Sequence, residues 1–443
     1  MIDHREIFSD CARWQSWLDV EAALAGVQGD LKIIPTWAAE TIIFNAKIEK
    51  LDEERIYFEI KKTGSPVFAL VRIFADLCGE AGNYVHLGAT TQNIIETGRL
   101  LILQKYNKIL LRALTQILEK LKNMAFEHAD TLMVGRTQLN HALPITFGFK
   151  VAGWINDFII LIEKINDSEK RLFLLRFGGA VGAFHSFGPM GQKLSEELAR
   201  KLNLKTALVQ GRSSPEGQLE YIVNLCSIGQ LISKIASELY FLHGDGINEL
   251  EEDVDVDIIG SSTMPHKINA KKLINLRANS SILIQKMAAV MSFTNPLNEG
   301  DASSNKEITS MFQSTCPAAI DLLQELLIVF DSLRINEEKM KVNAKSSEYF
   351  TASEALQMKL ANRIGKLNAH HTIHDVSQKS MGNADVFFQI LKNEPEIKQN
   401  FSENELLSTL KAENNLGQSA KVATMASEFA CGKIAEISKK LDS

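Results

Sequence analysis

The chain has 443 residues, of which 45% are hydrophobic and 23% are charged, as in an ordinary globular protein. Its net charge of −6 argues against a nucleic-acid-binding surface, and no stretch reaches the roughly 18 uninterrupted apolar residues of a membrane span. We expect no signal peptide, because the N-terminus is acidic and lacks an apolar core, and five scattered cysteines without a Cys-x-x-Cys pair predict a reduced, cytoplasmic protein.

Helical patterns follow one another along the whole chain. Residues 1–98 carry short helical patterns, beginning with "FSDCARWQSWLDVEAALA". Five long amphipathic helices come next, because leucines and isoleucines recur at three and four residues with Lys and Glu between them. Shorter helices are predicted again in residues 341–443. The five long helices are expected at residues 96–133, 141–176, 217–246, 267–294 and 318–343.

These patterns predict an all-α protein with a central bundle of long helices. The long helices are apolar over more than one stripe, and such a helix must be covered on most of its sides. One bundle of this size rarely covers such helices alone, so the pattern favours a helical oligomer. We expect an N-terminal helical domain at 1–98, the long-helix bundle at 99–340 and a C-terminal helical domain at 341–443.

Four non-helical stretches lie at the ends of the long helices and combine glycine with hydroxyl, amide or imidazole side chains. Glycine lets the backbone approach a ligand closely, and unpaired N–H groups at a helix start bind anions. Brought together in an antiparallel bundle, the four stretches would form an anion-binding cleft. Taken singly, each stretch is more commonly an ordinary turn between helices. They are "YVHLGATTQN" (84–93), "MVGRTQLNHALP" (133–144), "RFGGAVGAFHSFG" (176–188) and "GSSTMPHKIN" (260–269).

The last stretch closely resembles the signature loop of the fumarase/aspartase superfamily, in its 3-carboxy-cis,cis-muconate cycloisomerase and adenylosuccinate lyase branches. The stretches "HLGATTQNIIET", "GRTQLNHALPITFG" and "FGGAVGAFHSFG" agree with the family in the same order. The resemblance implies a three-domain, all-α homotetramer whose central helices form a twenty-helix core. It also implies active sites shared by three subunits, a small-molecule carboxylate substrate, and neither a metal nor another cofactor.

The resemblance also implies roles for individual residues. Removing the proton next to a carboxylate creates a dianionic intermediate, which needs a base and fixed positive charge. Ser261 matches the family's base, and Lys267 and Asn269 match the residues that stabilise the intermediate. His141 is the candidate for a second proton transfer, with a purely structural histidine as the alternative. The implied substrate-binding residues are His86, Thr90, Thr91, Gln92, Gln138, Arg212, Ser262 and Met264.

Several positions depart from the family's pattern and remove charge. Gln138 stands where adenylosuccinate lyases have a histidine that acts as general acid, and an amide cannot transfer a proton. Ile268 and Gly300 stand where arginines are usual, and only Arg212 remains in the stretch "QGRSSPEGQLEY" (210–221). We therefore expect a substrate with fewer negative charges than adenylosuccinate or 3-carboxymuconate.

Two other clusters are weaker candidates for metal sites. His370 and His374 are one helical turn apart, but no third ligand is evident. The acidic stretch at 248–257 lacks the glycine and closing Glu of a calcium loop, and we expect it to be a solvated acidic surface.

The functional expectation is a lyase that eliminates a leaving group from a succinate-like substrate, or catalyses the reverse addition, and releases fumarate or a related acid. The alternatives are an adenylosuccinate lyase of purine biosynthesis and a catalytically retired tetramer with a structural role.

Overall fold

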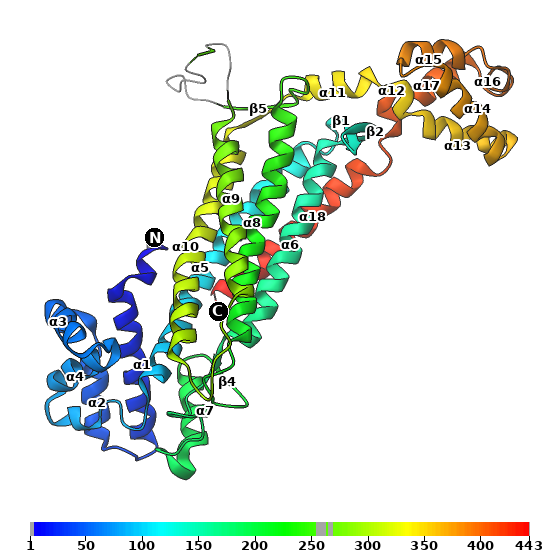
Figure 1. Ribbon diagram of the computed structural model, residues 1–443. Helices are drawn as coiled ribbons and strands as arrows, with labels where there is room; N and C mark the ends of the chain where they lie inside the picture. Colours follow the sequence, from blue (N-terminus) through cyan, green and yellow to red (C-terminus); the bar gives the residue numbers. More distant parts are fainter. Residues whose placement is uncertain (1–3, 254–262, 265–268, 443) are drawn as a thin grey trace. The chain divides into compact units, whose positions relative to one another are not determined.

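The computed structural model describes residues 4–253, 263–264 and 269–442 (Figure 1). The described chain contains eighteen α-helices and three short two-stranded sheets, which confirms the all-α expectation. It divides into two compact units. Unit 1 comprises Met1–Ala113, Leu161–Gln230 and Ser280–Leu322, and unit 2 comprises Leu114–Ile160, Leu231–Asn279 and Leu323–Ser443. The division into three domains stays a prediction.

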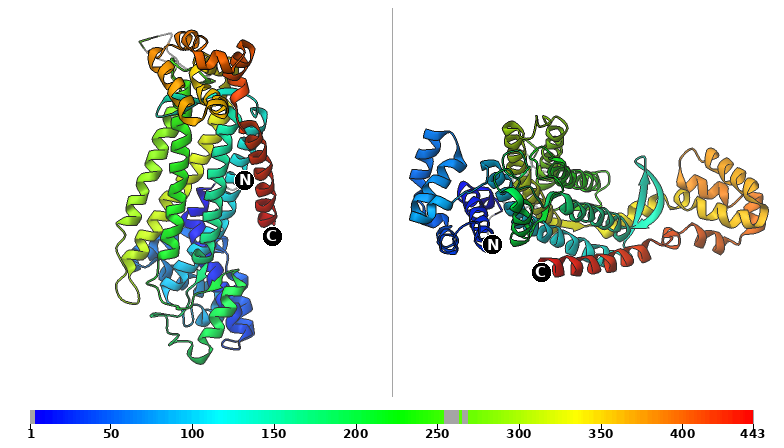
Figure 2. Two further views of the ribbon diagram at one scale, coloured as in Figure 1. Left: turned by 90° about the vertical axis from the view of Figure 1, so that its right-hand side faces the viewer. Right: turned by 90° about the horizontal axis from the view of Figure 1, so that it is seen from below.

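Five long helices contribute one segment to each unit, and within each unit these segments lie alongside one another (Figures 1 and 2). In unit 1 they are tied by buried hydrogen bonds: the Tyr106 hydroxyl donates to the Cys316 carbonyl at 2.9 Å, and the Tyr221 hydroxyl to Asn107 at 2.8 Å. The five helices are α5 (Thr91–Glu127), α6 (Phe147–Leu172), α8 (Glu216–His243), α9 (Lys271–Met291) and α10 (Ala302–Ser332).

The bounds of the fifth predicted helix are wrong. Instead of one helix at 318–343, α10 runs through Pro317 and ends at Ser332. A proline inside a helix costs one backbone hydrogen bond, and here the buried packing of α10 outweighs that cost. A short strand, β6 (Leu333–Ile335), and a new helix, α11 (Glu337–Ser346), follow, because the side chain of Asn336 accepts the backbone N–H of Lys339 as an N-cap.

Unit 1 also holds the N-terminal helices. Helix α1 begins after Ser9, whose hydroxyl accepts the backbone N–H of Ala12. Asp52 caps α3 in the same way, and Gly64 ends it in the left-handed conformation at φ +67°. The remaining elements of unit 1 are α1 (Asp10–Asp30), α2 (Thr36–Asn45), α3 (Glu53–Thr63), α4 (Pro66–Cys78), α7 (Gly191–Lys201), the parallel strands β3 (Leu174–Leu175) and β4 (Lys205–Thr206), and the 3₁₀ helices η1 (Glu6–Phe8), η2 (Ile48–Lys50), η3 (Gly79–Tyr84) and η4 (Gly188–Met190).

Unit 2 contains two antiparallel strand pairs, β1 (Leu132–Thr137) with β2 (Asn140–Thr146) and β5 (Leu250–Glu252) with β6. Helix α18 (Ser419–Asp442) runs beside the end of α5, where the Ser427 hydroxyl donates to the Lys122 carbonyl at 3.1 Å (Figure 2). The other elements of unit 2 are α12 (Glu348–Thr351), α13 (Ser353–Ile364), α14 (Lys366–Lys379), α15 (Ala384–Leu391), α16 (Pro395–Asn400), α17 (Glu403–Leu410) and η5 (Ala412–Asn415), and α12–α17 enclose a buried cluster that includes Leu356, Leu360, Phe387, Leu391 and Leu410.

Large apolar side chains on the long helices stay exposed in the single chain. Phe126 on α5, Ile282 on α9 and Ile328 on α10 retain 64%, 54% and 55% of their accessible surface. Single exposed apolar side chains are normal on a protein surface, and contiguous ones mark interfaces. These exposures are compatible with the expected self-association, and the homotetramer stays a prediction. Within the described ranges, no helix is long and apolar enough to cross a membrane.

Candidate active site

The start of α5 carries the first predicted site residues in unit 1. Thr90 precedes the helix, and Asn93 closes a reciprocal cap: its side-chain oxygen accepts the Thr90 N–H at 3.3 Å, and its backbone N–H donates to the Thr90 carbonyl at 2.9 Å. Because Asn93 holds this turn, Thr90 and Thr91 stay at the half-exposed helix N-terminus. Hydroxyls at this end of a helix suit a carboxylate ligand.

Two of the four predicted stretches pack together here. The amide nitrogen of Asn93 donates to the Arg176 carbonyl at 3.2 Å. Gly88, at φ +76°, lies against the Phe187 ring, and a Cβ at this position would come within 2.3 Å of it. The close approach explains the glycine. The structure therefore brings 84–93 and 176–188 together, and the cleft formed by all four stretches stays a prediction.

His86 is held by a buried glutamate that the sequence reading missed. One oxygen of Glu21 accepts the His86 backbone N–H at 3.1 Å, and the other lies 2.6 Å from the imidazole Nδ1. Glu21 lies on α1 and is only 2% exposed, so its hydrogen bonds with His86 take the place of water at the buried carboxylate. With the Glu21 oxygen as the acceptor, the tautomer assigned from this hydrogen bond has its proton on Nδ1 and leaves Nε2 for a ligand.

Gln92 and Arg212 meet in a recess of unit 1. The guanidinium Nη1 of Arg212 donates to Gln92 Oε1 at 3.0 Å, and Gln92 Nε2 donates to Glu96 at 2.6 Å. Both ends of the Gln92 amide are therefore occupied by the protein. Arg99 and Arg176 line the same recess. Of this set, the sequence reading identified only Gln92 and Arg212.

Burial dominates the electrostatics of the recess. Desolvation raises the pKa of Glu96, although Arg99, Gln92, Arg176 and Arg212 all oppose the shift. Desolvation likewise lowers the pKa of Arg99 to about 10, against the attraction of Glu96. Arg99 is therefore still protonated at neutral pH.

In unit 2, the stretch 133–144 forms a β-hairpin instead of a simple helix turn. Strands β1 and β2 are joined by Gln138 and Leu139, at φ +52° and +66°. A two-residue loop with two positive φ angles matches the strand twist, but Asn and Gly normally occupy it. Both residues are exposed, and Leu139 keeps 78% of its surface. The strained, exposed tip presents the neutral Gln138 side chain to solvent.

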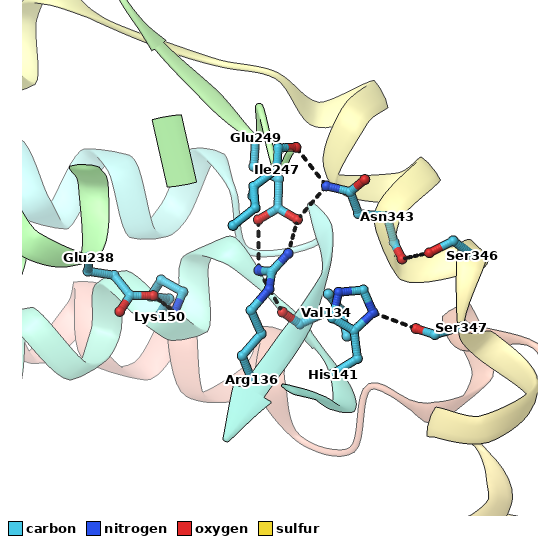
Figure 3. A network of polar contacts seen from close by, with 10 residues as sticks. All are labelled: Val134, Arg136, His141, Lys150, Glu238, Ile247, Glu249, Asn343, Ser346 and Ser347. Atoms are coloured by element: carbon cyan, nitrogen blue, oxygen red, sulfur yellow. Dashed lines mark hydrogen bonds and ion pairs between the residues drawn. The ribbon is translucent and has the colours of Figure 1, made fainter. Parts of the chain in front are cut away.

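His141 lies opposite Arg136 in the same hairpin, and both belong to a polar network (Figure 3). The imidazole Nδ1 lies 2.7 Å from the Ser347 hydroxyl. Arg136 donates two hydrogen bonds to Glu249, at 2.6 and 3.0 Å, and Asn343 donates a further one at 2.9 Å. The Glu249 side chain is completely buried, so the bidentate pairing satisfies a charge that water cannot reach.

The pKa of His141 lies below its ordinary value of 6.5. Desolvation is the main cause, the positive charge of Arg136 acts in the same direction, and Glu249 opposes both. The imidazole is thus neutral at pH 7 and able to accept a proton.

The predicted catalytic loop lies only partly within the described residues. Ser261, Ser262 and Lys267 lie outside them. Met264 is 42% exposed, and Asn269 lies just before α9. The described parts of the chain before and after the loop are joined through Glu252, and this carboxylate is the N-terminal cap of α9.

Glu252 accepts the backbone N–H groups of Lys272 and Leu273 at 2.9 and 3.0 Å and is 5% exposed. Glu249 is buried as well. The expectation of a solvated acidic surface is therefore wrong for these two carboxylates, because one neutralises a buried arginine and the other satisfies orphan N–H groups at a helix start. Charge composition alone does not separate buried from solvated acids.

The predicted residues thus fall into two groups. Unit 1 brings together His86, Thr90, Thr91, Gln92 and Arg212, and unit 2 holds Gln138, His141, Met264 and Asn269. Within the described ranges, no group of three His, Cys, Asp or Glu side chains is arranged to hold a metal ion. The sequence reading missed partners of these residues, namely Glu21, Glu96, Arg99, Arg176, Glu249 and Ser347.

Comparison with known proteins decides the family. A protein-family model described as "Lyase" matches residues 45–283. The N-acetyl-S-(2-succino)cysteine lyase of Dickeya dadantii is 30% identical over 97% of this chain and 94% of that protein. The chain is a lyase of the fumarase/aspartase superfamily.

Two further comparisons locate this lyase among its relatives. The adenylosuccinate lyase of Methanocaldococcus jannaschii is 28% identical over 94% of this chain and 91% of that protein. The structure of the 3-carboxy-cis,cis-muconate lactonizing enzyme from Pseudomonas putida superposes with a TM-score of 0.85 at 26% identity, over 98% of this chain and 97% of that one. These two relatives belong to the two branches that the signature motifs predicted. The superposition shows that the chain has the fold of the superfamily.

Proposed function

We propose that this lyase cleaves a carbon–sulfur bond by β-elimination, converting an S-(2-succino) thiol into fumarate and the free thiol. A base removes the proton next to one carboxylate, the electron pair forms the carbon–carbon double bond, and the C–S electrons leave with sulfur. The similarity to the Dickeya dadantii N-acetyl-S-(2-succino)cysteine lyase over nearly the whole chain supports this substrate class.

The neutral side chain of Gln138 carries the proposal. Expulsion of an amine requires protonation of nitrogen as the bond breaks, and an amide side chain at the hairpin tip cannot supply that proton. A thiol leaves readily as the thiolate, because its ordinary pKa is about 8.5. A site with glutamine in place of an acidic histidine is therefore suited to a sulfur leaving group.

The other roles follow from the resemblance and from the described geometry. Ser261 acts as the base, and Lys267 and Asn269 stabilise the dianionic intermediate. Thr90 and Thr91, at the positive end of α5, bind a carboxylate of the succinyl half. His141, neutral at pH 7, takes part in proton transfer to or from the bound substrate. No cofactor is needed for this chemistry.

A phosphorylated nucleotide is a poor fit for the same site. Ile268 and Gly300 are uncharged where the related branches have arginines. Each lost charge-assisted hydrogen bond to an anion costs about 1.5–3 kcal/mol, so two losses weaken binding by a factor on the order of 10²–10⁴. We therefore propose that adenylosuccinate is not an efficient substrate. The proposed thioether carries three carboxylates, so it has fewer negative charges than adenylosuccinate but as many as 3-carboxymuconate, and the expectation of fewer charges is kept only against adenylosuccinate.

The active enzyme is proposed to be a cytoplasmic homotetramer with active sites built from three subunits. The support is the exposed apolar surface of the long helices and the division of the site residues between two units. In such an assembly one subunit contributes the α5 group and another the hairpin group.

Steady-state assays of fumarate release test the proposed reaction. The substrates are N-acetyl-S-(2-succino)cysteine, its matched analogue with NH in place of sulfur, and adenylosuccinate. We expect kcat/KM to be at least a hundredfold higher for the thioether than for the amine. An adenylosuccinate kcat/KM within the usual enzyme range of about 10⁴–10⁸ M⁻¹s⁻¹ would overturn the proposal.

A further inference from the structure

The recess beside the start of α5, which we call the arginine recess, has an excess of positive charge. Arg99, Arg176 and Arg212 line it, and Glu96 is the only carboxylate among the described lining residues. Three guanidinium groups against one carboxylate leave an excess of about two positive charges. In the part of the chain that the structure describes, none of the three forms an ion pair with a carboxylate oxygen. Positive charge gathered without matching carboxylates favours an anionic ligand.

Hydrogen-bonding capacity in the recess is also unused. Arg99 is 8% exposed and donates through Nη1 to Asn305 at 2.9 Å and to Thr309 at 2.8 Å. Its Nε, and the Nε of Arg212, are buried without a hydrogen-bond partner among the described residues. A buried guanidinium N–H that has no acceptor is costly, and a bound carboxylate would provide that acceptor.

Gly300 determines where the Arg212 guanidinium can lie. A Cβ at position 300 would stand 2.2 Å from Nη2 and 2.6 Å from Cζ of Arg212. Any larger residue would therefore displace the guanidinium. Gly300 carries no charge, but its missing side chain leaves the space that the Arg212 guanidinium occupies. Arg212 in turn donates a hydrogen bond to Gln92, which directly follows Thr91.

The size of the recess limits how much of an anion can enter. Its free space is about 10 Å³, which is close to the minimum for one water molecule. One carboxylate oxygen has the size of a water, so it fits the recess while the second oxygen stays at the mouth.

We infer that the arginine recess is the subsite for the carboxylate of the thiol leaving group, with Arg212, seated against Gly300, as the residue that selects for it. The inference rests on the proposed C–S lyase function and extends it from the bond that is cleaved to the part of the substrate that determines specificity. Arg176 and Arg99 contribute the surrounding positive field.

The test pairs two substrates with two kinds of variant. N-acetyl-S-(2-succino)cysteine and N-acetyl-S-(2-succino)cysteamine differ only in the leaving-group carboxylate. Arg212→Gln removes the charge, and Gly300→Ala keeps the charge but displaces the guanidinium. We expect either change to lower kcat/KM about 10- to 100-fold for the cysteine adduct and less than about threefold for the cysteamine adduct. Arg171→Gln is the matched control, because Arg171 pairs with Glu220 and Asp167 at the surface of unit 1 and should affect neither substrate.

A binding measurement separates this inference from the proposed reaction. By calorimetry, N-acetylcysteine should bind the wild-type enzyme at least about tenfold more tightly than N-acetylcysteamine, and Arg212→Gln should abolish the difference. If this difference in binding is seen but neither adduct is turned over, the C–S lyase function is contradicted and the carboxylate subsite is still supported. Equal binding of the two thiols, or equal losses for both adducts in folded variants, would overturn the subsite.

Discussion

The imidazole Nδ1 of His141 lies 2.7 Å from the hydroxyl of Ser347, a residue 206 positions further along the chain. The hairpin that carries His141 and the turn that separates α11 from α12 are thereby joined at a candidate catalytic residue (Figure 3). A hydroxyl both donates and accepts, so it holds the ring orientation in either tautomer and leaves Nε2 for the substrate.

Ser347→Ala should lower kcat about tenfold with little change in KM, because the ring loses one orienting hydrogen bond. Ser347→Thr keeps the hydroxyl and should restore most of the activity. Steady-state kinetics across the pH range distinguish positioning from packing. A Ser347→Ala enzyme with an unchanged rate and pH profile would show that the contact does not serve catalysis.

The pH dependence of stability provides a check on the environment of His141. Its pKa in the folded protein lies below 6.5, so the unfolded chain binds the proton more readily. The contribution of His141 to the free energy of unfolding is therefore fully present above pH 6.5 and is lost as the pH falls through the pKa of the folded state. NMR titration should place the His141 pKa below 6.5, and His141→Gln should flatten this part of the stability curve. A folded pKa at or above 6.5 would contradict the partial desolvation and the Arg136 charge that are held to lower it.

The buried pair of Arg136 and Glu249 should be costly to break. Glu249→Gln leaves a guanidinium without its counter-charge, and we expect a loss of about 3–5 kcal/mol in the free energy of unfolding. The matched control is Asp157→Asn, which breaks the exposed pair with Lys234 and should cost less than about 1 kcal/mol. Urea denaturation measures both. Equal losses would mean that burial does not set the strength of the Arg136 pair.

Glu252 should stabilise the helix that follows the signature loop. Glu252→Ala removes the acceptor of two N–H groups at the start of α9 and should cost about 1–2 kcal/mol. Hydrogen exchange should show faster exchange at Lys272 and Leu273 and unchanged rates in the middle of α9. Uniform acceleration along the helix would argue against a local cap.

Ser261→Ala should abolish turnover while the thermal stability stays close to that of the wild type, because the proposed base makes its contribution only in the reaction. If active sites are shared, mixing Ser261→Ala with His141→Asn after mild dissociation should restore activity in a fraction of the tetramers. Light scattering provides the control on assembly. A stable monomer, or mixed tetramers that remain inactive, would rule out the shared site.

The sequence by itself predicted the helical class and the superfamily. A 3.6-residue apolar repeat needs only neighbours along the chain, so the five long helices could be recognised before any contact was known. The specific letters of 260–269 and the stretches that accompany it identified the superfamily, and the roles they assign to individual residues stay predictions. The loss of charge at Gln138 and Gly300 could also be read from the sequence, because it depends only on which residue stands at each position.

Only the tertiary structure decided how those residues are held. Helix α10 passes through Pro317 because packing outweighs a local preference, and the hairpin at 132–146 forms despite two non-glycine residues with positive φ. The pairing of Glu249 with Arg136, 113 residues apart, and the place of Arg212 against Gly300 depend on contacts between distant segments. A linear sequence gives residue types and spacing, but burial and partnership, which determine whether a charge is solvated, neutralised or available for a ligand, are properties of the folded chain.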